Sequence, residues 1–95
     1  MILTYLQKKV FALTKEGDTV GVSTLRYLIS ALKNREIQLR DEGKPLDKEA
    51  VLKVLRKQIK QHKESISIYE SAGRSDLVEK ERAELEVLEK LLPEI

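Results

Sequence analysis

The feature of this 95-residue sequence most able to do chemistry is a row of basic side chains in its second half. Their spacings of 3, 1, 3 and 3 place them on one face of a helix, and we call this row the basic ridge: Lys53, Arg56, Lys57, Lys60 and Lys63. Such a ridge can follow a nucleic-acid backbone, because phosphate contact needs charge and reach but no base-specific geometry. The alternative is a ridge that is solvated or paired with acidic residues, since no aromatic side chains interleave with it to stack on bases.

Charge is divided unevenly along the chain, although the net charge is only +2. Residues 26–63 contain eleven Lys or Arg against five Asp or Glu, whereas residues 64–95 contain four against nine. The middle of the chain is therefore basic and its end is acidic, which favours an anionic partner for the middle or pairing between the two parts.

Other chemistry finds little support in the residue types. The chain has no Cys and one His, and its four glycines are isolated, so neither a nucleophile with its base nor a phosphate-binding loop is expected. His62 falls on an apolar stripe, where it is either a structural residue with one hydrogen bond or a polar group exposed in a groove; Ile59 stands where a di-iron motif needs Glu. The acidic run at 79–84 is expected to be a solvated face. We predict no catalytic residue, no metal ligand and no cofactor.

Composition points to helices. The sequence is 41% hydrophobic and 36% charged with only 4% aromatic residues, a mixture typical of an all-α soluble domain. No apolar run approaches the roughly 18 residues of a membrane span, and Lys8 and Lys9 come too early for a signal-peptide core. We therefore expect a cytoplasmic protein without membrane contact.

Apolar periodicity predicts four helices, at about residues 1–16, 19–40, 47–72 and 75–92. Asp18 and Asp47 are expected to cap the second and third helices. Ser75 or Asp76 is expected to cap the fourth, with Glu79 completing a capping box. Because the turn around Gly73 is short, the last two helices should form a long antiparallel hairpin in a four-helix domain.

Several motifs occur in order along nearly the whole chain: Leu25-Arg26, Lys33-Asn34-Arg35-Glu36-Ile37, Asp41-Glu42-Gly43-Lys44-Pro45-Leu46, Lys60-Gln61-His62-Lys63-Glu64-Ser65-Ile66, Ala72-Gly73-Arg74-Ser75-Asp76-Leu77-Val78-Glu79-Lys80-Glu81 and Leu91-Leu92-Pro93. Together they resemble the YqeY family, which is related to the C-terminal tail domain of the GatB subunit of tRNA-dependent amidotransferases.

The resemblance implies the first of two helical subdomains over residues 1–95, and a second subdomain is expected to be absent. It also implies association with tRNA, together with a family label of glutamine-dependent carbon-nitrogen ligase. Catalysis by this chain alone is not expected, given the residue types above. Three basic residues in the matching segments join the candidate nucleic-acid-binding residues: Arg26, Lys33 and Arg35.

Two functions follow as hypotheses. The first is a non-catalytic module that associates with tRNA or another RNA through the basic ridge. The alternative is a module for protein-protein interaction or self-association that binds no nucleic acid.

Overall fold

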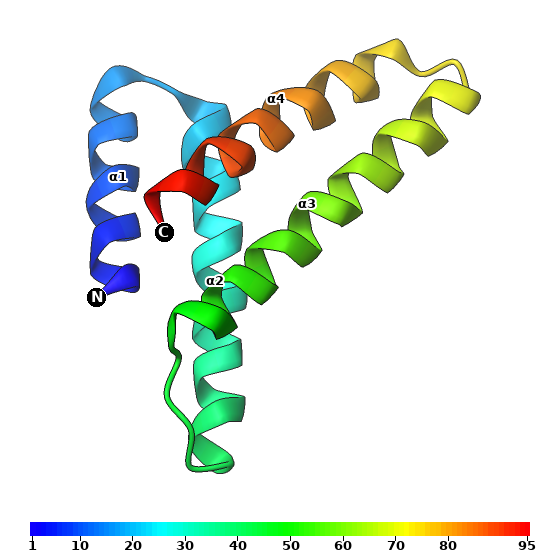
Figure 1. The fold of residues 1–95 in the computed structure, drawn as a ribbon. Coiled ribbons are helices and arrows are strands. Elements are labelled where there is room, and N and C mark those ends of the chain that lie inside the picture. Colours follow the sequence, from blue (N-terminus) through cyan, green and yellow to red (C-terminus); the bar gives the residue numbers. More distant parts are fainter.

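The computed structural model describes all 95 residues, Met1–Ile95, and contains helices but no strands (Figure 1). This confirms the all-α fold, and each helix boundary lies within about one residue of its expected position. The elements are α1 (Ile2–Glu16), α2 (Thr19–Asp41), α3 (Lys48–Ser71), α4 (Ser75–Leu91) and a final 3-10 turn, η1 (Leu92–Glu94).

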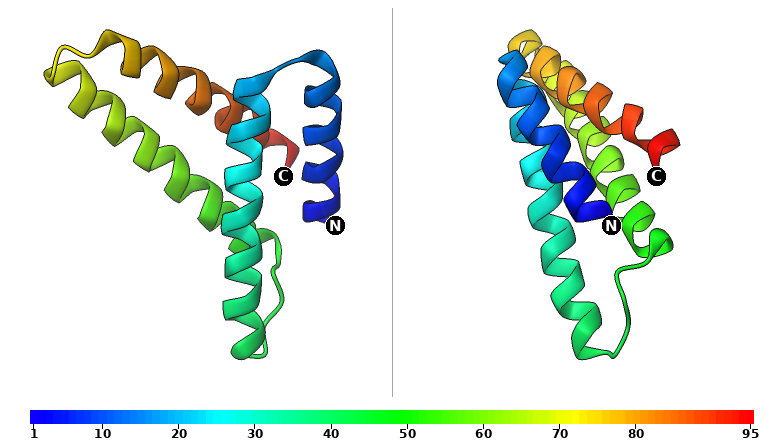
Figure 2. Two further views of the ribbon diagram at one scale, coloured as in Figure 1. Left: turned by 180° about the vertical axis from the view of Figure 1, so that it is seen from behind. Right: turned by 90° about the vertical axis from the view of Figure 1, so that its left-hand side faces the viewer.

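The helices form two antiparallel pairs. α1 packs against α2, and α3 packs against α4 as the expected hairpin. The hairpin crosses α2 obliquely, and its tip, near Gly73, projects away from the first pair (Figure 2). The molecule is consequently elongated, with extents of 46 × 31 × 21 Å.

One hydrophobic cluster joins all four helices where the two pairs cross. It is built from the apolar stripe of each helix, and its members with 0% exposure are Leu6, Leu28, Leu32, Leu55 and Leu88. Ile66 and Val78 are also buried but lie outside this cluster, in the outer half of the hairpin. The hairpin is thus anchored to the rest of the domain at its open end.

Side-chain caps begin two of the helices as predicted. Asp18 accepts a hydrogen bond from the backbone N–H of Gly21 at 2.8 Å, and Asp47 accepts one from Ala50 at 2.9 Å. Each cap satisfies one of the N–H groups that a helix leaves free at its first turn.

The predicted cap of α4 is wrong. The N-cap residue is Arg74, which makes no side-chain cap, so Ser75 and Asp76 already lie inside the helix and no capping box with Glu79 forms. Asp76 is engaged by Arg74 instead, at 3.1 and 3.2 Å, and the Arg74 guanidinium holds the pKa of Asp76 below its usual range.

Gly43 and Gly73 end α2 and α3 as expected, with φ of 72° and 70°. At the hairpin tip, Gly73 N–H donates to the carbonyl of Glu70 and Arg74 N–H donates to the carbonyl of Tyr69, which is the hydrogen-bond pattern of a Schellman motif. Because glycine adopts positive φ without steric strain, the chain reverses within three residues.

Three polar side chains, which we call the polar clamp, link η1 to α1. Glu94 accepts hydrogen bonds from the Tyr5 hydroxyl and from Lys9 Nζ, the second at 2.8 Å. The Lys9 ammonium, followed by the Tyr5 hydroxyl, lowers the pKa of Glu94, and the hydrogen bond to Glu94 raises the pKa values of Lys9 and Tyr5. Glu94 therefore stabilises the ammonium form of Lys9 and the hydroxyl form of Tyr5, and these two groups stabilise the carboxylate form of Glu94. These are the forms that predominate at neutral pH.

Leu88→Ala tests the anchoring of the hairpin. The Leu88 side chain has no exposed surface, so its truncation should lower the free energy of unfolding by about 2–5 kcal/mol. Ile68→Ala, at a 65% exposed position of α3, should change it by about 0.5 kcal/mol or less. Urea denaturation followed by circular dichroism measures both, and equal losses would contradict the docking of α4 described above.

Glu94→Gln tests the clamp through its pH dependence. The pKa of Glu94 is lower in the folded chain than its ordinary value of 4.5, so the clamp stabilises the fold above about pH 4.5 and this contribution is lost as the pH falls through the lowered pKa. The raised pKa values of Lys9 and Tyr5 preserve the contribution up to about pH 10. Because the pair of Glu94 and Lys9 is screened by solvent, we expect Glu94→Gln to lower the free energy of unfolding by about 0.5 kcal/mol at pH 7.

Thermal melts of the wild type and Glu94→Gln at several pH values measure this difference. The difference in melting temperature between the wild type and Glu94→Gln should become smaller below pH 4.5. The control Glu79→Gln changes an exposed position of α4, and its difference from the wild type should not shrink in this way. A gap between wild type and Glu94→Gln that persists unchanged into strong acid would be inconsistent with an ionised Glu94 in the clamp.

Candidate nucleic-acid interface

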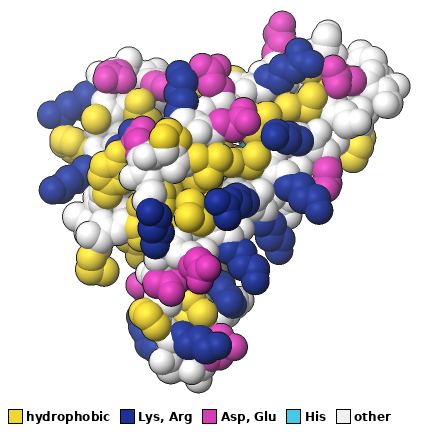
Figure 3. All heavy atoms as spheres, in the orientation of Figure 1, with side chains coloured by type: hydrophobic (Ala, Val, Ile, Leu, Met, Phe, Trp, Pro, Cys, Tyr) yellow, Lys and Arg dark blue, Asp and Glu magenta, His cyan; other side chains and the backbone are white.

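The basic ridge lies on the surface of α3 as the sequence predicts. All five of its side chains are exposed. At 100° per residue they occupy an arc of about 120° around the helix, and Lys53 and Lys63 are about 15 Å apart along its axis. Figure 3 shows Lys and Arg side chains in a row along the edge of α3 that faces away from α4.

Pairing of the ridge with the acidic helix is limited to one residue. Lys63 Nζ lies 3.9 Å from Glu89 Oε2 of α4, whereas the other four ridge residues form no ion pair. Acidic residues of α4 have other partners: Glu86 pairs with Lys90, and Glu81 and Glu84 face His62. The four remaining charges of the ridge are therefore directed to solvent and available to an anion.

A surface groove continues the ridge toward the connection between α2 and α3. Lys44 of that connection lines it together with Lys53 and Arg56 of the ridge. The two acidic residues of the groove are Asp47, whose carboxylate caps α3, and Glu49. The basic surface is thus broader at the start of α3 than the ridge alone.

The three candidate residues of α2 do not form one group. Arg26 and Lys33 are both exposed and lie seven residues apart, so they share a face of the helix. Arg35 is half-buried and donates to Gln38 Oε1 at 3.1 Å. No hydrogen bond or ion pair links any of the three to the ridge, so the ridge stands as the main candidate surface.

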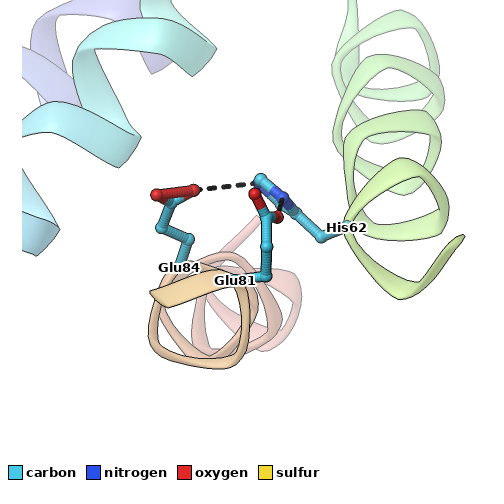
Figure 4. Close-up of side chains that lie close together, drawn as sticks. All are labelled: His62, Glu81 and Glu84. Carbon is cyan, nitrogen blue, oxygen red and sulfur yellow. Dashed lines mark hydrogen bonds and ion pairs between the residues drawn. The ribbon is translucent and has the colours of Figure 1, made fainter. Parts of the chain in front are cut away.

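His62 lies opposite the ridge on α3 and faces two carboxylates of α4 (Figure 4). Its Nδ1 is 2.6 Å from Glu81 Oε2, and its Nε2 is 4.0 Å from Glu84 Oε2. The structural interpretation of His62, with one hydrogen bond, matches this geometry.

The expectation that the 79–84 run is a solvated face is correct only in part. Glu79, Lys80 and Arg82 are exposed, but Glu81 and Glu84 are half-buried, with side chains 18% exposed, because they point toward α3. Sequence reasoning missed this group of three. The available signal was the turn: His62 lies eleven residues before Gly73 and Glu84 lies eleven residues after it, so a hairpin centred there brings them together.

None of the helices is both long enough and apolar enough to cross a membrane.

The fold and its surface define an all-α domain of two antiparallel helix pairs with one strongly basic helix face. The chain belongs to the YqeY-like protein family, whose family model matches residues 3–95. The family model thereby confirms the resemblance to the YqeY family.

Relatives of the chain include three fungal proteins, each named "Altered inheritance of mitochondria protein 41, mitochondrial". The protein from Lachancea thermotolerans is 38% identical over 78 residues, which cover 82% of this chain and 41% of the relative. The protein from Eremothecium gossypii is 34% identical over 87 residues, which cover 92% of this chain and 46% of the relative. The protein from Saccharomyces cerevisiae is 33% identical over 78 residues, which cover 82% of this chain and 41% of the relative.

Two consequences follow from these relatives. The chain spans less than half the length of each of them. Their names also place them in mitochondria, which contradicts the prediction of a cytoplasmic protein. That prediction rested on composition and on the early lysines, Lys8 and Lys9, and neither carries information about the compartments in which relatives work.

Proposed function

We propose that this domain is a non-catalytic RNA-associated module that contacts phosphates through the basic ridge of α3, with tRNA as the first candidate. The observation that carries the proposal is the set of unpaired charges on the ridge: Lys53, Arg56, Lys57 and Lys60 are exposed on one helix face and form no ion pair. The relation of the YqeY family to the tail domain of GatB, which the resemblance implies, supports tRNA as the partner.

Physical chemistry favours phosphates over a protein surface as the ligand of this ridge. Four unpaired cations within about 10 Å along one helix face repel one another and are surrounded by counter-ions. The phosphates of a nucleic-acid backbone bound along the ridge would neutralise these cations and so relieve the repulsion. Release of the cations condensed on the nucleic acid adds to the driving force. The ridge contains no exposed aromatic or aliphatic anchor of the kind that a protein interface usually buries at its centre.

The proposal limits what the module reads. Lysine is a flexible point charge, and three of the four unpaired ridge residues are lysines. Contacts of this type position an RNA without identifying its bases. The domain should therefore bind RNA by shape and charge, and sequence selectivity would have to come from another part of the protein or from a partner.

Neutralising the ridge should weaken RNA binding and flatten its salt dependence. In Lys53→Gln/Lys57→Gln/Lys60→Gln, each lost phosphate contact should reduce the magnitude of the slope of log K against log salt by about 0.7–0.9. Fluorescence anisotropy of labelled bulk tRNA, titrated with the chain at 50 and 200 mM salt, gives both quantities. Since these side chains are exposed and unpaired and Gln has a helix propensity close to that of Lys, the fold should be unaffected.

The matched control is Lys8→Gln/Lys15→Gln/Lys80→Gln, which removes the same net charge from exposed positions of α1 and α4. The control should retain the affinity and salt slope of the wild type to within about twofold. Equal weakening by both triple variants would reduce the effect to net charge and reject the ridge as the contact surface. Absence of binding by the wild type at 50 mM salt would reject RNA association and favour the protein-interaction alternative.

A further inference from the structure

We infer that His62, Glu81 and Glu84 form a binding site for a divalent transition-metal ion between α3 and α4. The three side chains come from facing sides of the hairpin and point toward one another (Figure 4). One potential ligand atom from each can be chosen so that all lie within 4.8 Å of one another. The site is distinct from the basic ridge, which lies on the opposite face of α3, and it does not depend on RNA binding.

The charge of the cluster is unbalanced without an ion. Glu81 and Glu84 have side chains only 18% exposed, and neither pairs with Lys or Arg. The other ion pairs of the structure involve neither of these two carboxylates. His62 is therefore the sole basic group that faces them. Partly buried charges are normally paired with an opposite charge or coordinate a metal. A divalent cation balances two carboxylates and a neutral imidazole.

A second observation points to a ligand at the same place. Gln58, one turn before His62 on α3, lines the same cavity, together with Tyr27 of α2. The Gln58 residue is only 5% exposed, and its Oε1 has no hydrogen-bond partner. A buried amide oxygen without a partner has lost its hydrogen bonds to water and gained none in return, which is unfavourable. An ion, or a water molecule bound to an ion, would supply the missing partner.

The donor set selects the class of ion. One imidazole nitrogen and two carboxylate oxygens suit Zn²⁺ and similar transition ions, whereas Mg²⁺ and Ca²⁺ prefer oxygen ligands alone. Tetrahedral ligands about 2.1 Å from Zn²⁺ lie ~3.4 Å apart. The present separations lie on both sides of that value, with His62 Nδ1 2.6 Å from Glu81 Oε2 and His62 Nε2 4.0 Å from Glu84 Oε2, so binding requires both carboxylates to shift. Three protein ligands leave a fourth position open to water in the cavity.

The consequence of binding would be mechanical. Ile66 and Val78 are the buried residues that hold the outer half of the hairpin, and they lie outside the main cluster. An ion held by α3 and α4 at His62 would link the two helices between that cluster and the tip. Because the ion binds the folded chain, it should also raise the melting temperature.

Isothermal titration of the untagged chain, stripped with a chelator and titrated with ZnCl₂, tests the site. We expect one Zn²⁺ per chain with micromolar or tighter affinity and a higher melting temperature with Zn²⁺ present. Glu81→Gln/Glu84→Gln should weaken binding at least tenfold and abolish the thermal shift. The control Glu79→Gln/Glu89→Gln, which removes the same charge from exposed positions of α4, should bind like the wild type.

A gain-of-affinity variant keeps the test independent of folding defects. Gln58→Glu places a third carboxylate beside the cluster and should tighten Zn²⁺ binding. Lack of saturable Zn²⁺ binding by the wild type below 1 mM, or equal binding by Glu81→Gln/Glu84→Gln, would overturn the site. Equal affinity for MgCl₂ would overturn its assignment to a transition ion.

Discussion

The single buried stripe of α3 is the constraint on which the rest of this structure depends. α3 is the longest helix, and it is buried along one face only, through Val51, Leu55, Ile59 and Ile66. Its other face has no helix to cover it and must be polar. The basic ridge occupies that face, and α4 with its carboxylates occupies the side facing the stripe. Both candidate surfaces therefore follow from how α3 is packed.

Periodicity made the fold predictable because it records this packing directly. Leu55, Ile59, His62 and Ile66 recur at helical spacing, and Gly73 marks the turn with a residue suited to positive φ. The same reasoning located the exposed ridge, since charged residues at helical spacing opposite an apolar stripe face solvent. It failed at the start of α4, where Arg74 engages the Asp76 carboxylate that was expected to cap the helix.

The cluster of His62 with Glu81 and Glu84 shows where sequence reasoning reaches its limit. Each helix taken alone gives an ordinary explanation for its residues: a polar position on a stripe, and an acidic run on a charged helix. The three side chains meet only because the register of the hairpin is fixed by the turn at Gly73 and by the packing of α4 on α3. Register is a tertiary property, and periodicity within one helix cannot report it.

Two polar residues interrupt the stripe of α3 at an informative position. Gln58 lies on the buried face among the last cluster residues of α3, Leu55 and Ile59, and His62, one turn further on, separates the cluster from the smaller contact near the hairpin tip. Apolar residues at these positions would extend the cluster outward and remove the cost of burying Gln58 Oε1. Lys60 and Lys63 of the ridge lie on the opposite face of α3 at the level of His62. α3 therefore presents polar side chains on both of its faces at this level, one face exposed to solvent and the other directed at the carboxylates of α4.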